Sequence, residues 1–471
     1  MGDNMKNIIL IGLGPHAKRI YINFIKKYKL NLSLLVDLDI NKEEIKTFLK
    51  KEKFAYTKVY FVKSEEANNK ELTITVKKDL KKLIQENKIT YAIISTEPKA
   101  HFAYAKFLIK NNISILMDKP ITSSLDVLNS IFSAKQIKKE YDILLNLYKN
   151  HKEKIKFTIQ CQRRFHPGYL YIKKILLDTI KKYNIPITYI DIYHSDGMWN
   201  MPNEFLSREN HPYKYGYGKL FHSGYHFIDI LTWLLECNKY SDKKINNATI
   251  YSTVFRPYDF FQTVDNNFYK NYFNTNEFQE ILQKPSIVSS FGELDFHSMI
   301  DFKMDDKIIT HCTLNLMQSG FSKRAWKNLP KDTYKANGRV RHERVNIHVG
   351  PILNIQIHSY QSYEVNEKSD ILKDDIGGID HFDIYIFRNT KLIGGKSFEK
   401  IKLQDIDDNK DITLGNNEKA REKCFYKFFM NEKNESDFIY HQNSILLLSK
   451  LCESIANHTN KVNFKWGSYE K

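Results

Sequence analysis

Short apolar runs alternate with amphipathic helical segments over the first 150 residues. The apolar runs are predicted strands, at Asn7–Ile11, Leu32–Val36, Val59–Val62, Tyr91–Ser95 and Ile113–Met117. Helical spacing of apolar positions follows them, at Lys18–Tyr28, Asn41–Lys51, Lys78–Glu86 and Lys99–Asn111. Strands that alternate with helices at this spacing require right-handed crossovers, which build a parallel sheet. We therefore expect a doubly wound α/β domain over residues 1–150.

The pattern changes after about residue 150, where strand-like runs follow one another with few helices between them. These runs are Lys156–Gln162, Ile187–His194, Ala248–Phe255, Met299–Lys303, Ile308–Leu316, Val345–His358 and His381–Arg388. The clear helices are Gly218–Leu235 and a C-terminal one over about Asp437–His458. Successive strands favour a large, mostly antiparallel sheet, so residues 151–471 are expected to form a second domain.

Three segments of this second region do not fit the strand pattern. The segment Asn203–Tyr217 is rich in Pro, His, Asn and Tyr, and we expect it to be a loop over the functional site. The segments Asp259–Ser286 and Ser322–Asn337 are expected to be insertions into the sheet. We find no internal repeat that would explain them.

The overall composition is that of a globular protein. Of the 471 residues, 42% are apolar and 27% charged, values that exclude a disordered or fibrous chain. No uninterrupted apolar run is long enough to cross a bilayer, so no membrane association is expected. The N-terminal residues lack a cleavable signal pattern, and we expect a cytoplasmic protein.

The chain is strongly basic, with 72 Lys and Arg residues against 55 Asp and Glu residues. Such a surplus is typical of nucleic-acid partners. Here the lysines are spread along the chain in pairs such as Lys26-Lys27 and Lys77-Lys78, without a basic block or a known nucleic-acid motif. We expect no nucleic-acid partner, and an acidic or phosphorylated small substrate would suit the charge.

The cysteines give no sign of a metal centre. Cys161, Cys237, Cys312, Cys424 and Cys452 are far apart and include no Cys-x-x-Cys pair. An odd, scattered set is typical of reduced thiols, as opposed to a disulfide framework or a zinc site.

A glycine-rich turn, Gly12-x-Gly14-x-x-Ala17, lies between the first strand and the first helix and includes Pro15. Gly12 allows a tight turn, Gly14 allows the backbone to approach a pyrophosphate, and Ala17 keeps helix and strand close. Asp37 ends the second strand, where a carboxylate would accept from an adenosine ribose hydroxyl and repel a 2′-phosphate. The pattern predicts NAD as cofactor, with NADP disfavoured. The alternative is a turn that binds nothing.

Asp118-Lys119-Pro120 follows the predicted strand Ile113–Met117 directly. In a parallel sheet this places Lys119 at the carboxyl edge, where ligands bind in such folds. A lysine there can transfer a proton or bind a substrate hydroxyl, whereas a lysine at a strand end is more often only a solvated charge.

Three polar residues share one face of the otherwise apolar helix Gly218–Leu235, namely His222, His226 and Asp229. Histidines four residues apart can chelate a metal, but no glutamate follows the first one as it does in zinc proteases. The other interpretations are half-buried structural histidines and a catalytic acid/base histidine.

Taken together, these motifs resemble the glucose–fructose oxidoreductase/inositol dehydrogenase (Gfo/Idh/MocA) family. The stretches that carry the resemblance are Ile8–Gly14 with Asp37, Ser95–His101, Asp118–Pro120, Gln162–Pro167, Gly224–Asp229, and Cys452–Ala456 with Lys461-Val462. Each motif is modest, but their order and spacing are specific together. The resemblance is poor between about Asp259 and Lys419.

The resemblance implies an N-terminal Rossmann domain and a C-terminal open-faced, mainly antiparallel sheet, often used to form homodimers or homotetramers. It implies Lys119 as the active-site lysine and His226 as the acid/base residue. The residues that it implies on the cofactor side are Ser95, Thr96, Glu97, His101, Asp118, Lys119 and Arg163. No metal ligand is implied.

Two residues depart from the family pattern. Asp118 stands where a glutamate is usual, and His222 stands where many sugar dehydrogenases of the family carry an aspartate. We expect His222 to be a neutral hydrogen-bonding partner of the substrate. The sequence thus predicts an NAD(H)-dependent oxidoreductase acting on a sugar, sugar nucleotide or cyclitol. The alternatives are an NAD-dependent glycoside-cleaving enzyme and a non-catalytic ligand sensor on the same scaffold.

Overall fold

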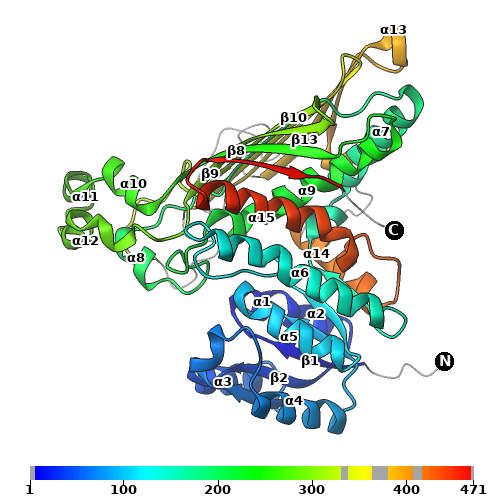
Figure 1. Ribbon diagram of the computed structural model, residues 1–471. Helices are drawn as coiled ribbons and strands as arrows, with labels where there is room; N and C mark the ends of the chain where they lie inside the picture. The colour runs from blue at the N-terminus through cyan, green and yellow to red at the C-terminus, as the bar shows by residue number, and fades with distance from the viewer. Residues whose placement is uncertain (1–5, 330–337, 363–379, 407–415, 468–471) are drawn as a thin grey trace. The chain divides into compact units, whose positions relative to one another are not determined.

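The computed structural model describes residues 6–329, 338–362, 380–406 and 416–467. The chain forms two compact units (Figure 1). Unit 1 consists of Met1–Ser124, Gln136–His166 and Thr413–Ile445, and unit 2 of Leu125–Lys135, Pro167–Ile412 and Leu446–Lys471. The two units are therefore interleaved along the chain. Part of the expected second insertion, residues 330–337, lies outside the described residues.

Unit 1 contains a six-stranded sheet in which every neighbouring pair is parallel. Its strands are β1 (Asn7–Ile11), β2 (Asn31–Leu38), β3 (Lys58–Val62), β4 (Tyr91–Ile94), β5 (Ser114–Met117) and β6 (Phe157–Ile159). Their order, β3-β2-β1-β4-β5-β6, is that of a Rossmann fold, with the topological switch between β1 and β4. The expected parallel α/β sheet is confirmed.

The sixth strand corrects one prediction. The run Lys156–Gln162 was expected among the antiparallel strands, but β6 pairs in parallel with β5. All three residues of β6 are buried. A strand this short, buried on both faces, shows no alternation that would distinguish one kind of sheet from the other.

The helices of unit 1 include a C-terminal one that the sequence did not predict. The helices are α1 (Pro15–Arg19), α2 (Tyr21–Lys27), α3 (Lys42–Lys51), α4 (Ile74–Glu86), α5 (Pro98–Lys110), α6 (Ile131–His151) and α14 (Asn416–Phe429). In α14, the Phe425 ring lies 5.2 Å from that of Phe24 and 5.9 Å from that of Tyr28. Helix α14 thus completes the hydrophobic core beside β1 and β2.

Unit 2 is built on a nine-stranded sheet, ordered β14-β13-β12-β11-β7-β10-β9-β8-β15. Its strands are β7 (Tyr189–Ser195), β8 (Asn247–Phe255), β9 (Asp295–Met304), β10 (Lys307–Met317), β11 (Val340–Val349), β12 (Leu353–Ser362), β13 (Asp380–Arg388), β14 (Phe398–Lys402) and β15 (Lys461–Lys465). Among the neighbouring strands described in this sheet, β7 and β10 pair in parallel and all other pairs are antiparallel. The mainly antiparallel sheet is confirmed.

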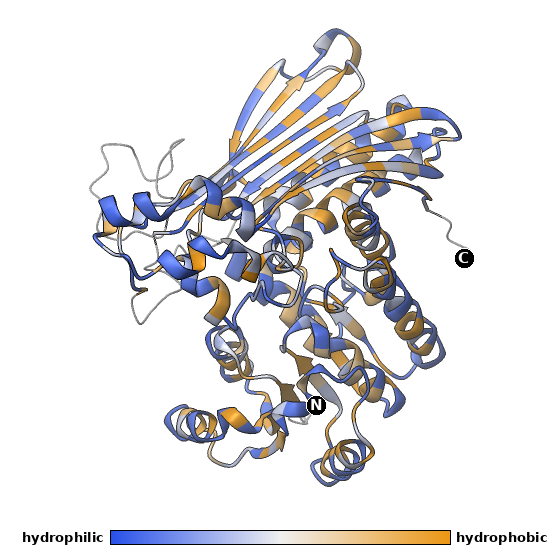
Figure 2. Cartoon of the chain, turned by 60° about the vertical axis from the view of Figure 1, so that its left-hand side comes forward, coloured by the Kyte–Doolittle hydropathy of each residue, from blue (hydrophilic) through white to orange (hydrophobic). Residues whose placement is uncertain are grey.

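The two faces of this sheet differ in burial. In β11, Val345 and Ile347 are buried, whereas Arg344 and Asn346, which alternate with them, reach solvent. Figure 2 shows the same alternation of hydrophobic and hydrophilic residues along the other strands. Helices α7 (Pro167–Tyr183) and α9 (Tyr225–Leu235) contact strands β11 and β7. One face is therefore packed and the other is open, as expected.

One expectation for unit 2 is corrected. The run Val345–His358 is divided between β11 and β12, which form a hairpin that turns at Gly350, where φ is +49°.

The insertion Asp259–Ser286 is helical, and its helices are α10 (Pro257–Thr263), α11 (Asn266–Phe273) and α12 (Gln279–Gln283). They enclose an aromatic cluster that includes Phe260, Tyr269 and Phe278. Each of these helices has too few residues for a helical period to be recognised in the sequence.

None of the described helices is long and apolar enough to cross a membrane. All five cysteines lie among the described residues, all are buried, and no disulfide joins any two of them.

Candidate functional site

The two glycines of the glycine-rich turn differ in their surroundings. Gly12 is closely packed, whereas the space around Gly14 is open. Gly12 has φ +89°, and a Cβ added there would lie 2.6 Å from the carbonyl oxygen of Ser95. Gly14 precedes α1, is exposed, and has open space around a Cβ position. Ala17 is fully buried, and Pro15 is exposed at the first helical position. The backbone around Gly14 is accessible where a pyrophosphate is predicted to bind.

Asp37 ties this turn to the end of β2. Its Oδ2 accepts from the backbone N–H of Leu13 at 2.7 Å, and its Oδ1 accepts from Leu38 N–H at 2.7 Å and from Asn41 Nδ2 at 2.8 Å. An ionised carboxylate has about four acceptor positions, so this arrangement leaves room for a ribose hydroxyl. The local geometry fits the role predicted for Asp37.

We expect Asp37→Asn to reduce the preference for NADH over NADPH roughly tenfold, because the variant lacks the charge that would repel a 2′-phosphate. Asparagine keeps the size of the side chain, so the turn should remain ordered. The ratio of the two dissociation constants, from fluorescence titration, measures the effect. Asp39→Asn is the matched control, since the Asp39 carboxylate accepts from Ser64 at the neighbouring strand end. A wild-type protein that binds NADPH more tightly would contradict the assignment.

The end of β5 is held by hydrogen bonds to Asp118. Ser95 Oγ donates to Asp118 Oδ2 at 2.6 Å, and the buried Tyr21 hydroxyl donates to Oδ1. Burial and the adjacent Asp118 charge raise the pKa of Tyr21, which therefore remains a donor. Lys119, half-buried, follows directly at the carboxyl edge of the sheet. Asp118 thus fixes the backbone from which Lys119 projects. The contribution of Tyr21 was not predicted from the sequence.

His101 is a structural link between two strand ends. Its ring is fully buried, with Nδ1 2.9 Å from the Pro120 carbonyl oxygen and Nε2 3.0 Å from that of Thr96. Burial lowers the pKa of His101, although the Asp118 charge and the two carbonyl oxygens oppose that shift. It connects the segments that follow β4 and β5, which carry Ser95 and Lys119.

The remaining predicted cofactor residues are less central to this arrangement. Glu97 precedes the first turn of α5, next to Thr96. Arg163 is buried in the 3₁₀ turn Gln162–Phe165, which packs against α14. A cofactor contact of either residue stays a prediction.

In unit 2 the helix with the three polar residues begins with a π-helical turn, Leu220–Gly224, followed by α9. His222 lies in the π turn, with its Nε2 3.2 Å from the Pro212 carbonyl oxygen and its ring stacked on that of His211 at 4.8 Å. His226 and Asp229 are buried in α9. His222 therefore holds the segment Asn203–Tyr217. This segment was expected to be a loop, but its first residues belong to the short helix α8 (Pro202–Ser207).

Glu293 caps the N-terminus of this helix. Its Oε1 accepts from Leu220 N–H at 2.7 Å, and its backbone carbonyl oxygen accepts from Lys219 N–H at 2.9 Å. The side chain is completely buried, and its Oε2 has no hydrogen-bond partner among the residues that the structure describes. Burial raises the pKa of Glu293 to about 7, from an ordinary value of 4.5.

We expect Glu293→Gln to flatten the pH dependence of stability between about pH 4.5 and 7. In that range the unfolded chain has lost the carboxyl proton that the folded chain retains, so the stability of the wild type falls as pH rises. Glutamine keeps the acceptor for Leu220 without the charge. Above pH 7 the variant should be more stable by ~1 kcal/mol or more. Urea unfolding followed by tryptophan fluorescence checks this, because all four tryptophans lie in unit 2. Parallel curves for both proteins would contradict it.

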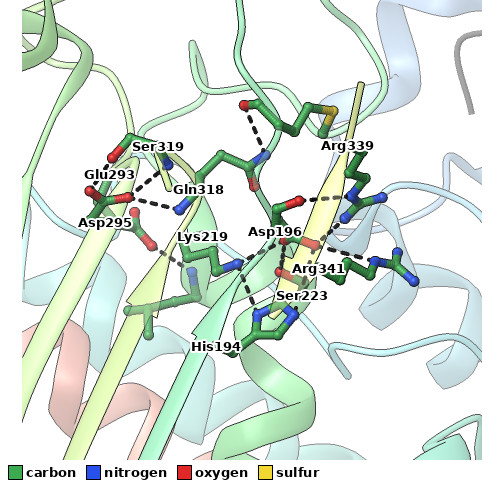
Figure 3. Close-up of polar contacts among 12 residues, drawn as sticks. His194, Asp196, Lys219, Ser223, Glu293, Asp295, Gln318, Ser319, Arg339 and Arg341 are labelled. Atoms are coloured by element: carbon green, nitrogen blue, oxygen red, sulfur yellow. Dashed lines mark hydrogen bonds and ion pairs between the residues drawn. The ribbon is translucent and has the colours of Figure 1, made fainter. Parts of the chain in front are cut away.

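A buried cluster of charged residues surrounds Asp196 at the end of β7 (Figure 3). Lys219 Nζ lies 2.8 Å from Asp196 Oδ2 and 3.1 Å from His194 Nδ1. Arg339 and Ser223 also donate to the Asp196 carboxylate, and Arg341 Nε lies 3.6 Å from its Oδ1. We call these residues the Asp196 cluster, and its members are His194, Asp196, Lys219, Ser223, Arg339 and Arg341.

The neighbouring cations hold the pKa of Asp196 well below its usual range, against the opposing effect of burial. Burial lowers the pKa of Lys219 to about 8, although the adjacent Asp196 opposes that shift. Sequence analysis missed this cluster. The one local signal is a lysine, Lys219, at the start of an apolar helix, three residues before His222.

A family profile matches the N-terminal part of the chain. Residues 7–142 match the sequence profile of the GFO_IDH_MocA family, described as an oxidoreductase family with an NAD-binding Rossmann fold. No curated protein sequence matches the chain.

Solved structures share the fold over nearly the full length. An oxidoreductase domain protein from Kribbella flavida has a TM-score of 0.57 at 11% identity, covering 98% of this chain and 100% of that one. Scyllo-inositol dehydrogenase from Lactobacillus casei gives 0.53 at 14% identity, with coverages of 98% and 99%. The WlbA dehydrogenase from Bordetella pertussis, in complex with NADH and UDP-GlcNAcA, gives 0.55 at 10% identity, with 99% of each chain covered.

Proposed function

We propose that the chain is an NAD-dependent oxidoreductase that acts on a sugar, sugar nucleotide or cyclitol. Residues 7–142 match the profile of an oxidoreductase family with an NAD-binding Rossmann fold. Solved structures of the same fold include an inositol dehydrogenase and a dehydrogenase in complex with a sugar nucleotide. The reaction proposed is hydride transfer between a substrate carbon that bears a hydroxyl group and the nicotinamide ring.

The observation that carries the proposal is the construction of the carboxyl edge of the unit 1 sheet. Gly12 packs against Ser95, and Ser95 in turn binds Asp118, which precedes Lys119. The accessible turn at Gly14, the carboxylate of Asp37 and a lysine therefore lie at one sheet edge. This is the edge at which dinucleotides bind in such folds.

The protein side of the chemistry is binding and proton transfer. NAD supplies or accepts the hydride when it is bound. Lys119 is proposed to hydrogen-bond the reacting hydroxyl, and its ammonium group favours the alkoxide character that develops there. His226 is proposed to exchange the hydroxyl proton as general acid and base. His222 is proposed to bind the substrate in place of the usual carboxylate, in addition to holding the segment with Pro212.

A panel of sugars, cyclitols and sugar nucleotides tests the proposal by following the absorbance of the reduced nicotinamide. Turnover with one class supports the proposal. Release of free sugar from a glycoside without net NADH formation would identify a glycoside-cleaving enzyme instead. NADH binding without turnover of any compound would identify a ligand sensor.

A further inference from the structure

His16 lies in unit 1, between two strand ends that carry predicted cofactor residues. It follows Gly14 and Pro15 in the first turn of α1. Its ring extends to the end of β5, where Nε2 lies 3.9 Å from Asp118 Oδ1, and packs edge-on against the Tyr21 ring at 5.6 Å between centroids. Sequence analysis assigned no role to His16.

The strand order indicates which part of NAD the His16 ring would meet. In the order β2-β1-β4-β5, Asp37 lies near the end of β2, the Gly14 turn follows β1, and Asp118 follows β5. A dinucleotide lies along this edge, with its adenosine ribose at the second strand and its pyrophosphate at the glycine-rich turn. The nicotinamide half then lies on the side of β4 and β5. The His16 ring, between the turn and Asp118, is therefore on the side of the pyrophosphate where the nicotinamide ribose is expected.

The ring is accessible, and its nitrogens are available to a ligand. The side chain is 38% exposed, and 3.9 Å from Nε2 to Asp118 Oδ1 is beyond hydrogen-bond distance. Within the part of the chain that the structure describes, neither ring nitrogen of His16 makes a hydrogen bond. An uncharged imidazole offers one donor and one acceptor, so both are available at this edge of the sheet.

The charges around His16 keep its ring uncharged. Burial lowers the pKa of His16 to about 4, although the Asp118 charge opposes that shift. The positive charges of Arg421, Arg19 and Lys119 act in the same direction as burial. The ring is therefore uncharged at neutral pH. An uncharged imidazole is better suited to a hydroxyl group than to a charged pyrophosphate, which binds cationic donors more strongly.

Asp118 can fix the orientation of this ring. Its Oδ1 accepts from Tyr21 and its Oδ2 from Ser95. An ionised carboxylate has about four acceptor positions, so Asp118 retains capacity for a further donor. The facing carboxylate favours the tautomer with its proton on Nε2, and Nδ1 is then the acceptor that a ligand can use.

We propose that His16, oriented by Asp118, accepts a hydrogen bond from a hydroxyl group of the nicotinamide ribose. This contact fixes the sugar that carries the nicotinamide ring, at the sheet edge that also carries Lys119. The inference depends on the binding of NAD and is independent of which substrate the enzyme oxidises or reduces.

Three ligands that contain successively less of the cofactor test the contact. NADH, ADP-ribose and ADP all contain the linked phosphates, but ADP lacks the second ribose. Phenylalanine keeps an aromatic ring against Tyr21 without the nitrogens. We expect His16→Phe to weaken binding of NADH and ADP-ribose roughly three- to tenfold, the range for a hydrogen bond between uncharged groups. Affinity for ADP should be unchanged, which also verifies that the variant is folded. Calorimetric titration of the full chain measures all three affinities.

His151→Phe is the matched control. His151 ends α6, and its Nδ1 lies 2.9 Å from Asn112 Oδ1, just before the start of β5 and so at the opposite edge of the same sheet. Its replacement should leave all three affinities unchanged. Equal affinities of wild type and His16→Phe for ADP-ribose would overturn the inference. Equal losses for all three ligands would also overturn it, because the ring would then act on the pyrophosphate or on the fold.

The pH dependence of ADP-ribose binding provides a second test. The effect of His16→Phe should be the same at pH 6 and at pH 8, because the ring is uncharged at both. A contribution of His16 that grows as pH falls to 6 would identify a protonated ring bound to the pyrophosphate, and would overturn the inference.

Discussion

Lys119→Met is expected to lower turnover by roughly 10²–10⁴-fold, the range for loss of a positioned proton-transfer group. Methionine has a similar length and no charge, so the variant removes the ammonium group with little change in packing. The effect should fall on kcat, because the interaction strengthens as the hydroxyl loses its proton. Steady-state kinetics with the substrate found in the panel gives the measurement.

His226→Ala is the companion variant and should show a loss of the same order. NADH affinity should survive in it, because His226 belongs to unit 2 and the predicted cofactor residues belong to unit 1. Lys110→Met is the control for lysine replacement, since Lys110 is exposed at the last position of α5. Near-normal rates in Lys119→Met would mean that Lys119 is a solvated charge without a catalytic role.

Asp196→Asn is expected to destabilise unit 2 by about 3–5 kcal/mol, the effect of removing one partner from a buried ion pair. Asparagine preserves volume, but Lys219 and Arg339 lose the charge that offsets their desolvation. Unfolding of unit 2 in urea, followed by tryptophan fluorescence, measures the loss. The difference from wild type should be largest above pH 3.8 and shrink as pH falls through the lowered pKa of Asp196, because the folded carboxylate is then protonated.

Asp191→Asn on the same strand provides the comparison. The Asp191 carboxylate is partly exposed and accepts from Thr313 and Asn315. Its replacement should cost less than about 1 kcal/mol. Equal destabilisation by the two variants would show that the cations of the cluster do not depend on Asp196.

The parallel sheet of unit 1 could be predicted because its signals are local. The run Asn7–Ile11 matches β1 at both ends, and the helix over Asn41–Lys51 matches α3 within one residue. Gly12 could be identified from the turn itself, since a left-handed φ and contact with a neighbouring strand leave no room for a side chain. The positions of Asp37 and Asp118 follow from the same rule, that the carboxyl ends of parallel strands share one edge.

The elements that were misplaced lack such signals. Strand β6 is too short to show a period. Helix α14 packs against α2 through contacts such as Phe425 with Phe24, which are far apart in the chain. No pattern in the neighbouring residues indicates which sheet β6 pairs with or which core α14 packs into. That choice is made by burial against distant parts of the chain.

The sequence by itself determined the family resemblance, the dinucleotide turn, the lysine at the strand end and the mainly antiparallel second sheet. Each depends on residue type at a fixed spacing, and such spacing translates directly into a face or an edge. The tertiary structure decided the rest. Asp196 meets Arg339 across 143 positions and Lys219 across 23, and Glu293 reaches Leu220 across 73. The Asp196 cluster and the capped helix exist only because the strands of unit 2 bring these side chains together and remove them from water. No local pattern in the sequence indicates either feature.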